Sequence, residues 1–276
     1  MNKKPIPMVI AIVLIVLVAL IIINKNYFTN DSIKNETTGE IKNADIMKTD
    51  SVIPIVVEEN VKYFGDANGY FVYPKAPGNY PGIVMIHENR GLRPEIKETA
   101  ETLAKEGYRV LAVDLLGGTA EDQTGARALT SKFAQATGTA NMRAAAEYLR
   151  AKGATKIASI GWCFGGKQSI ELAVSGEKLD ATIVYYGGGM ATTTARLAPI
   201  KWPVLGIFGD KDQAIPVTMV RAFENSLKTL GIENEIHIYP GVGHAFANPS
   251  GMNYAPKETM DAWKKTLDFL AKNLKG

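Results

Sequence analysis

The stretch "KIASIGWCFGGKQSI", residues 156–170, contains the transition on which the fold depends. Residues 156–161 form an apolar, β-branched run, which is typical of a strand buried on both faces. From about residue 164 the sequence is compatible with a helix. Gly161 and Gly165 lie at the junction, where glycine permits a tight turn. Strand, turn and helix in this order predict one unit of a parallel sheet.

The same alternation extends outward along most of the chain. Strands are predicted at residues 53–59, 69–74, 82–87, 108–114, 156–161, 181–187, 203–209 and 235–240. Helices are predicted at residues 94–106, 121–151, 165–175, 216–230 and 256–273. The middle strands are almost continuously apolar, as expected when helices cover both faces of a sheet. We therefore expect an α/β fold with a doubly wound, mostly parallel sheet, in one domain over residues 51–276.

The first 50 residues have a different composition. Residues 5–23, "PIPMVIAIVLIVLVALIII", carry no charge, and a helix of this length covers a bilayer core of roughly 30 Å. The run is longer than the apolar region of a usual signal peptide, and no small-residue cleavage pattern follows it. We therefore expect residues 1–24 to form an uncleaved membrane anchor, with a cleaved signal peptide as the alternative. Residues 25–50 are polar and predict a tether.

The side of the membrane is predicted from the short basic stretch ahead of the apolar run. Lys3 and Lys4 precede it, while Lys25, Lys34 and Lys42 follow it among acidic residues. The Lys/Arg bias alone does not fix the orientation. The short basic N-terminus favours an orientation with the N-terminus inside and the domain on the extracytoplasmic side.

Composition excludes several functions. The formal net charge is only +3, and no dense Lys/Arg cluster is present in the domain, so nucleic acid is not an expected partner. No His/Cys cluster has the spacing of metal ligands and no phosphate-binding loop is present, so neither a metal nor an organic cofactor is predicted. The single cysteine excludes an intrachain disulfide and a resolving partner for thiol redox chemistry. The oligomeric state is not fixed by the sequence.

That single cysteine, Cys163, lies where such sheets bind ligands, beyond the carboxyl end of a strand. Gly161-Trp162-Cys163-Phe164-Gly165 matches the nucleophile-elbow pattern G-x-S-x-G with cysteine in place of serine. The elbow is a strained turn that exposes the nucleophile, and the following helix directs its free N–H groups and positive dipole end at it. The alternative is that Cys163 is a small buried apolar residue.

A cysteine nucleophile needs a base and an acid that orients the base. His244, in the loop "GVGHAF" after the last predicted strand, is the preferred base. His237 lies inside a predicted strand, and His87 precedes Cys163 in the chain. For the acid, "GDKDQAIP" offers Asp210 and Asp212. We prefer Asp212, because it lies deeper in the loop, and keep Asp210 as the alternative.

The motifs "VMIHENRGL", "GWCFGGKQS", "YYGGG", "GDKDQAIP" and "GVGHAFANP" together resemble the dienelactone hydrolase family of α/β-hydrolases, which is carboxymethylenebutenolidase-like. The resemblance covers most of residues 60–273. It implies a Cys163-Asp212-His244 triad and a small-molecule ester or lactone as the substrate. It also implies that Glu88 contacts the resting thiol and helps to deprotonate it when substrate binds.

Acyl transfer further needs donors for a developing oxyanion. The backbone N–H groups of Phe164 and Asn89 are expected to supply them. An aromatic pocket wall is expected around Tyr185.

One position departs from the family. The arginine that would hold a substrate carboxylate, a few residues beyond the histidine, is Asn248 here. Arg90 or Arg127 could replace it, and the dienelactone itself is therefore in doubt as the substrate. We expect a hydrolase of a small ester or lactone that acts through a cysteine acyl-enzyme. The alternative is a catalytically silent scaffold that binds a ligand or partner at the cell surface.

Overall fold

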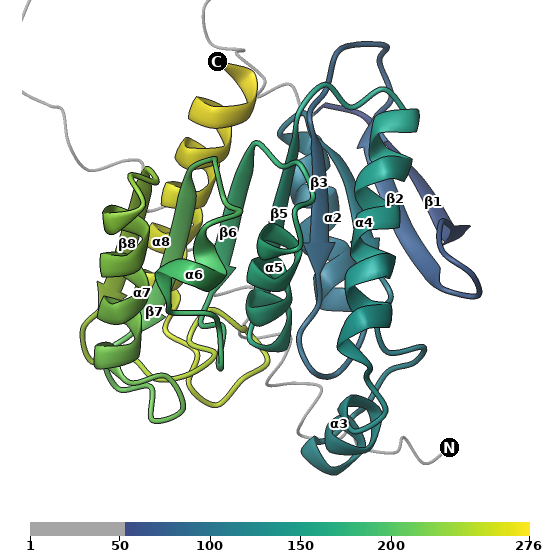
Figure 1. Cartoon of the computed structure of the whole chain (residues 1–276). Helices are drawn as coiled ribbons and strands as arrows, with labels where there is room; N and C mark the ends of the chain where they lie inside the picture. The colour runs from purple at the N-terminus through teal and green to yellow at the C-terminus, as the bar shows by residue number, and fades with distance from the viewer. Residues whose placement is uncertain (1–52) are drawn as a thin grey trace, which may run out of the picture. The chain divides into compact units, whose positions relative to one another are not determined.

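Eight strands form one sheet in the order β1-β2-β4-β3-β5-β6-β7-β8 (Figure 1). The computed structural model describes residues 53–276. β1 pairs antiparallel with β2 and β2 with β4, whereas all other neighbours are parallel. The strands are β1 (Ile55–Lys62), β2 (Asn68–Pro74), β3 (Gly82–Ile86), β4 (Arg109–Val113), β5 (Ile157–Trp162), β6 (Ala181–Tyr185), β7 (Val204–Gly209) and β8 (Asn234–Tyr239). The predicted α/β class and mostly parallel sheet are confirmed.

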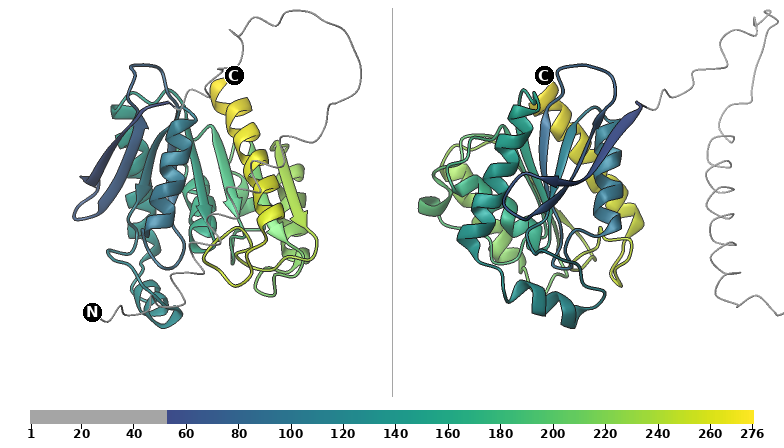
Figure 2. Two further views of the ribbon diagram at one scale, coloured as in Figure 1. Left: turned by 180° about the vertical axis from the view of Figure 1, so that it is seen from behind. Right: turned by 90° about the vertical axis from the view of Figure 1, so that its right-hand side faces the viewer.

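Helices cover both faces of this sheet. α2 (Pro94–Lys105) and α8 (Pro256–Leu270) lie on one face, and α4 (Gln135–Ala151), α5 (Phe164–Val174) and α7 (Val217–Thr229) lie on the other (Figure 2). The short α6 (Thr194–Leu197), which was not predicted, packs against α7. The last turn of the chain, Ala271–Lys275, is π-helical. The carboxyl ends of the parallel strands and the α3 helix (Gln123–Thr130) lie at the lower end of Figure 1.

The middle strands explain why the sequence alternates so clearly. Every residue of β3, β5, β6 and β7 is buried, because α2 and α8 cover one face while α4, α5 and α7 cover the other. Fully burying a Val, Leu or Ile side chain contributes about 1.5–3 kcal/mol. The uninterrupted apolar runs of these strands therefore stabilise a two-sided sheet.

The single helix predicted over residues 121–151 is wrong, because the structure has two helices there. Asp122 caps α3 by accepting a hydrogen bond from the Gly125 N–H at 2.8 Å. α3 ends at Thr130, and α4 begins at Gln135. Between them the Phe133 ring turns inward against Gly138, where an added Cβ would lie 2.2 Å from the ring. Phe133 therefore packs against α4 within the segment that separates the two helices.

The N-terminal predictions concern residues that the structure does not describe. The predicted membrane anchor, residues 1–24, and the tether, residues 25–50, lie outside residues 53–276. Within the described range, none of the helices combines the length and the apolar character needed to cross a bilayer.

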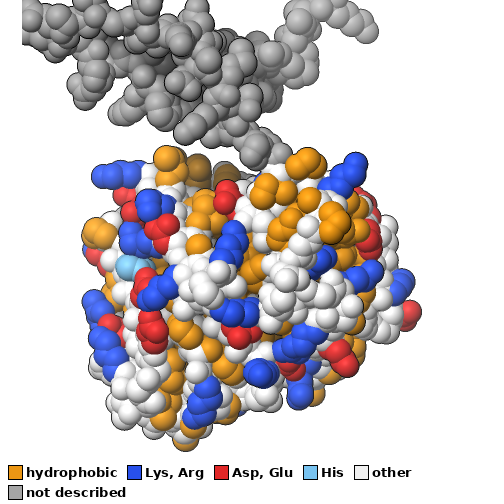
Figure 3. Space-filling model, turned by 90° about the horizontal axis from the view of Figure 1, so that it is seen from above, with side chains coloured by type: hydrophobic (Ala, Val, Ile, Leu, Met, Phe, Trp, Pro, Cys, Tyr) orange, Lys and Arg blue, Asp and Glu red, His pale blue; other side chains and the backbone are white. Residues whose placement is uncertain are grey.

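The face seen from above lies at the end of the sheet opposite the carboxyl ends of the parallel strands. On the described part of it, Lys and Arg side chains alternate with Asp and Glu (Figure 3). Because opposite charges alternate on this face, their electric fields largely cancel beyond about one Debye length from the surface, ~8–10 Å.

Candidate active site

Cys163 lies in a strained turn between β5 and α5. Its φ is +54° and its ψ is −115°, a region that residues with a Cβ rarely adopt. Its N–H donates to the Tyr185 carbonyl oxygen at 3.0 Å. A Cβ on Gly161 would lie 2.1 Å from the Gly165 carbonyl oxygen, and one on Gly165 would lie 2.3 Å from the Ile86 carbonyl oxygen. The glycines are therefore required by the close approach of backbone on both sides of the thiol.

Cys163, His244 and Asp212 form one hydrogen-bonded chain. His244 Nε2 lies 3.1 Å from Cys163 Sγ, and His244 Nδ1 lies 2.7 Å from Asp212 Oδ2. The three residues follow β5, β8 and β7 respectively, so the parallel sheet brings together positions up to 81 residues apart. The structure therefore places the predicted nucleophile, base and acid in contact.

The two candidate acids have different partners. Asp212 is buried, and its Oδ1 accepts from the N–H groups of Ala214 and Ile215 at 2.9 and 3.0 Å, which leaves Oδ2 for His244. Asp210 instead accepts from the Gly241 N–H at 2.7 Å and pairs with Lys211 at 3.7 Å. Asp210 thus holds a turn, and Asp212 orients the histidine.

The charge on His244 depends on these neighbours. Burial by itself would lower its pKa, but the hydrogen bonds to Asp212 and Cys163 outweigh burial and raise the pKa to about 10. An imidazolium is therefore favoured at neutral pH. Its Nε2–H would donate to Sγ and stabilise negative charge there.

The loop after His244 carries Asn248 toward the site. Ala245 has a φ of +61°, and its carbonyl oxygen accepts from the Asn248 N–H at 3.0 Å. Asn253 Nδ2 donates to the His244 carbonyl oxygen at 2.9 Å. Asn248 Oδ1 accepts a hydrogen bond from the Ser250 N–H at 2.9 Å. Because a backbone N–H can only donate, the atom facing it must be the amide oxygen, and Asn248 Nδ2 therefore faces away from Ser250.

Asn248 Nδ2 donates to Glu88 Oε2 at 2.6 Å. The Tyr186 hydroxyl lies 3.5 Å from Glu88 Oε1, a long contact. Within the described residues, these are the hydrogen bonds of the Glu88 carboxyl group, whereas the Cys163 thiol pairs with His244. The contact between Glu88 and the resting thiol that the resemblance implied is therefore not formed here. Burial raises the pKa of Glu88, and this effect outweighs the hydrogen bond from Asn248 and the charge of His244, which both lower it.

The two expected oxyanion donors are the backbone N–H groups of Phe164 and Asn89. Phe164 is the first residue of α5, and Asn89 follows Glu88 in the loop after β3. Neither backbone N–H has an acceptor among residues 53–276. Both are therefore available to a ligand atom.

His87 is a feature of the site that the sequence reasoning missed. It is fully buried. The Leu115 N–H donates to its Nε2 at 3.2 Å, so Nδ1 must carry the proton and donate to the Glu88 carbonyl oxygen at 2.6 Å. Burial lowers the His87 pKa, in agreement with a neutral ring. The sequence signal for this residue is its position directly after a buried strand.

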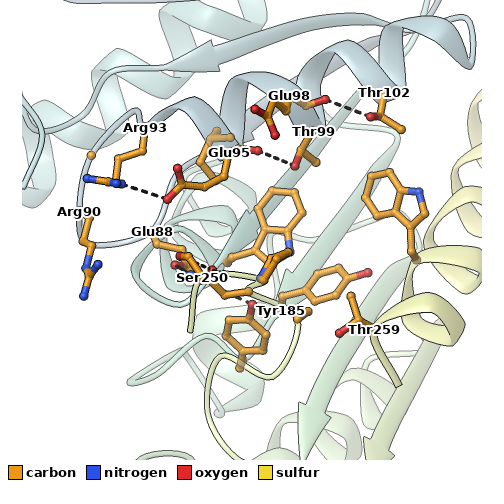
Figure 4. Close-up of a pocket in the computed structure, with 18 residues that line it drawn as sticks. Glu88, Arg90, Arg93, Glu95, Glu98, Thr99, Thr102, Tyr185, Ser250 and Thr259 are labelled. Atoms are coloured by element: carbon orange, nitrogen blue, oxygen red, sulfur yellow. Dashed lines mark hydrogen bonds and ion pairs between the residues drawn. The ribbon is translucent and has the colours of Figure 1, made fainter. Parts of the chain in front are cut away.

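Beside these groups lies a cavity of about 420 Å³ between α2 and α8 (Figure 4). Tyr185, Arg90 and Asn248, all predicted to bind substrate, line it, whereas Arg127 is an exposed residue of α3 outside it. Trp263 of α8 also lines the cavity and was missed, because nothing in the local sequence of a helix indicates which strand ends it faces. Within residues 53–276, His, Cys, Asp and Glu form no group of three or more that could hold a metal.

Comparisons with known proteins agree with this fold and geometry. The dienelactone hydrolase family profile matches residues 67–274. A carboxymethylenebutenolidase of Pseudomonas putida is 28% identical over 221 residues, which is 76% of this chain and 93% of that protein. A putative carboxymethylenebutenolidase of Methylorubrum extorquens is 27% identical over 248 residues, 84% of this chain and 79% of that protein. The crystal structure of a putative dienelactone hydrolase from Klebsiella pneumoniae superposes with a TM-score of 0.72 at 25% identity, covering 79% of this chain and 99% of that one.

The sheet order, the turn at Cys163 and the structural similarity define an α/β-hydrolase. Within this class, the chain belongs to the dienelactone hydrolase family, as the match over residues 67–274 shows. It is a hydrolase of carboxylic ester bonds.

Proposed function

We propose that this chain hydrolyses a small carboxylic ester or lactone through a covalent thioester on Cys163. The observation that carries the proposal is the continuous hydrogen-bonded chain from Cys163 Sγ through the His244 ring to Asp212 Oδ2, with separations of 3.1 and 2.7 Å. A nucleophile, a base and an orienting acid in this geometry suit acyl transfer.

In the first half of the reaction, Cys163 Sγ attacks the ester carbonyl carbon. The carbonyl oxygen becomes an oxyanion, which the N–H groups of Phe164 and Asn89 stabilise. The C–O bond to the alcohol then breaks, and His244 Nε2 donates a proton to the departing oxygen. The acyl group stays on sulfur as a thioester.

In the second half, His244 is neutral and acts as a base. It takes a proton from a water molecule that attacks the thioester carbonyl carbon, the C–S bond breaks, and the acid leaves. Asp212 keeps Nδ1 protonated, so that Nε2 is the atom that exchanges protons in both halves. The net reaction consumes one water and releases an alcohol and an acid.

The surroundings of Glu88 support a substrate without a carboxylate beside this residue. Asn248 is a neutral hydrogen-bond donor at the position where the family resemblance implied an arginine. An anionic substrate group placed there would lose the ion pair that an arginine supplies. Arg90 lines the rim of the cavity and is the nearest alternative for such a group.

The test is hydrolysis of p-nitrophenyl acetate by the full chain, followed by mass spectrometry of the stopped reaction. We expect turnover, a mass increase of one acetyl group, and loss of both in Cys163→Ala. In His244→Ala we expect turnover to fall while the protein stays folded. Met260→Ala, a change at an exposed residue of α8, is the control and should behave as the wild type. A folded wild type that is inert on this ester and on a dienelactone would instead favour the silent scaffold.

We also propose that residues 1–24 anchor the enzyme in a membrane with the hydrolase domain on the extracytoplasmic side. Support comes from the uncharged residues 5–23 and the lysines before them. The test is alkaline extraction of membranes from cells that express the full chain, followed by protease treatment of intact cells. Release of the chain by alkali would contradict the anchor, and protection from external protease would contradict the orientation.

A further inference from the structure

The cavity between α2 and α8 is not explained by the acyl-transfer chemistry. Its floor is formed at the carboxyl ends of β5 and β6 by Trp162 and Tyr185, while Thr99 and Thr102 of α2 line one side and Trp263 of α8 the other. Figure 4 shows the α2 residues along one side and Thr259 of α8 across from them. A volume of about 420 Å³ lies within the range of small-molecule sites.

One end of the cavity adjoins the reacting groups. Trp162 directly precedes Cys163, and Glu88 directly precedes Asn89. Tyr186, which also lines this end, has its ring centroid 5.3 Å from that of His244. Cys163 and His244 are not among the lining residues, so a substrate with its carbonyl carbon at Cys163 would reach the cavity with the substituent that extends toward Tyr186.

The walls of the cavity suit an uncharged, flat group. Four aromatic side chains line it, and aromatic rings pack well edge-to-face or offset on one another. The hydroxyls of Thr99 and Thr102 already donate to the carbonyl oxygens of Glu95 and Glu98 one turn earlier, at 2.8 and 3.0 Å. The hydrogen atoms of these two hydroxyls are therefore already used and do not require a polar ligand.

Charges near the cavity are either neutralised or at its rim. Arg93 pairs with Glu95 at 3.0 Å, and Glu98 is exposed to solvent. Glu88, at the inner end, receives the amide hydrogen bond of Asn248, and burial raises its pKa toward the neutral form. Of the two arginines that line the cavity, Arg93 is paired, and Arg90 lies at the end near Glu88 (Figure 4).

We propose that this cavity binds an uncharged aromatic group of the ester substrate and makes the enzyme selective for esters that carry one. The inference rests on the proposed hydrolase function and specifies its substrate class. A cavity of about 150 Å³ suffices to hold benzene, so the observed volume accepts a ring and a short linker. The group can reach the cavity from the acyl side or from the alcohol side of the ester, and the experiment separates these two cases.

The experiment compares three esters of similar chemical reactivity on the full chain. Benzyl acetate carries the ring on the alcohol side, methyl 3-phenylpropanoate carries it on the acyl side, and ethyl acetate carries none. We expect kcat/KM for one of the two aromatic esters to exceed that for ethyl acetate roughly 10- to 100-fold, the discrimination that burial of an apolar group supplies. The ester that is preferred identifies the side.

Two substitutions alter the cavity without touching the reacting groups. Thr99→Phe fills it, and Trp263→Ala removes one aromatic wall. Both should bring kcat/KM for the preferred aromatic ester down toward that for ethyl acetate, while the value for ethyl acetate stays within about twofold. Met260→Ala, on the same helix as Trp263 but outside the cavity, should change neither value.

Equal effects of Thr99→Phe on all three esters, or no effect on any, would overturn the proposal while leaving ester hydrolysis intact. If no ester is turned over, a binding measurement still tests the cavity independently of the proposed hydrolysis. N-benzylacetamide and N-methyl-3-phenylpropanamide are unreactive amides, and their affinity for Cys163→Ala can be measured by calorimetry. Weaker binding of one amide when Thr99→Phe is added supports the cavity even without turnover, and affinities for both amides that Thr99→Phe leaves unchanged overturn it.

Discussion

The amide of Asn248 donates to the buried carboxyl group of Glu88 at 2.6 Å, across 160 positions of the chain. Glu88 thus pairs with Asn248, whereas the hydrogen-bond partner of the Cys163 thiol is His244. This pairing leaves Glu88 beside a neutral side chain. The site thus contains two separate polar groups, a cysteine-histidine-aspartate chain and a glutamate-asparagine pair.

The first prediction concerns the role of Glu88. Because the carboxyl group contacts Asn248 and not the thiol, and because burial raises its pKa, Glu88→Gln should retain the Asn248 hydrogen bond and much of the activity. We expect kcat on p-nitrophenyl acetate to fall less than about tenfold, whereas loss of a proton-transfer group costs on the order of 10²- to 10⁴-fold. A loss in that higher range would mean that Glu88 deprotonates the thiol, as the family resemblance implied.

The second prediction distinguishes the two aspartates of the loop after β7. Asp212→Asn removes the acceptor that holds His244 Nδ1, so kcat/KM should fall roughly 10²- to 10⁴-fold. Asp210→Asn is the matched control, because the partners of the Asp210 carboxylate among residues 53–276 are the Gly241 N–H and Lys211. It should stay within about threefold of the wild type, since removal of one such hydrogen bond costs about 1 kcal/mol. Equal losses in both variants would contradict the assignment of Asp212.

The third prediction is the alkaline limb of the pH profile. The pKa of His244 is raised to about 10, so the imidazolium that protonates the departing alcohol persists well above neutrality. We expect kcat/KM to hold from pH 7 upward and to fall as His244 loses its proton near pH 10. In Asp212→Asn one of the contacts that raise this pKa is lost, and the fall should move to lower pH.

A stability measurement checks the sign of the same shift. A raised pKa means that the charged His244 stabilises the fold fully below the ordinary histidine pKa of 6.5, and that this contribution is lost as pH rises through about 10. The melting temperature of the wild type should therefore decrease over this window. A wild type whose melting temperature rises steadily from pH 7 to 10 would contradict the shift.

The fourth prediction concerns His87. In a trans peptide the C=O of Glu88 and the N–H of Asn89 point in opposite directions, so a donor that holds the Glu88 oxygen also fixes the direction of the Asn89 N–H. In His87→Asn, the side-chain amide can still donate to the Glu88 carbonyl oxygen, as Nδ1 of the histidine does. In His87→Gln, the longer side chain can keep only the contact with the Leu115 N–H, which Nε2 makes in the wild type. We expect kcat of His87→Gln to fall up to about 10²-fold with little change in KM, as for loss of an oxyanion donor, and His87→Asn to recover part of it. Equal kcat values in two folded variants would leave His87 with a packing role alone.

The fifth prediction concerns the turn at the nucleophile. Gly165→Ala places a Cβ 2.3 Å from the Ile86 carbonyl oxygen, so backbone must shift. We expect the free energy of unfolding to fall by more than about 2 kcal/mol and activity to be lost. At Gly118 the nearest atom would lie 3.7 Å from an added Cβ, so Gly118→Ala is the control and should change stability by less than about 1 kcal/mol. Urea denaturation of both variants measures the difference, and a Gly165→Ala protein as stable as the control would refute the close contact.

The amino-acid sequence by itself determined the sheet and the position of the reactive turn. The sequence predicts eight strands and all eight are present; the signal is clearest in β3, β5, β6 and β7, because a strand buried on both faces must be largely apolar. Gly161 and Gly165 around Cys163 indicate the turn, because a side chain at either position would collide with backbone. Such local requirements leave a mark in the local sequence.

Only the tertiary structure decided which side chains meet. The choice between Asp212 and Asp210, the pairing of Glu88 with Asn248, and the cavity in front of Trp263 all depend on contacts between segments far apart in the chain. Hydrogen bonds and packing are short-ranged in space, not in sequence. The pattern of residues around each of these positions therefore carries no record of the partner it will find.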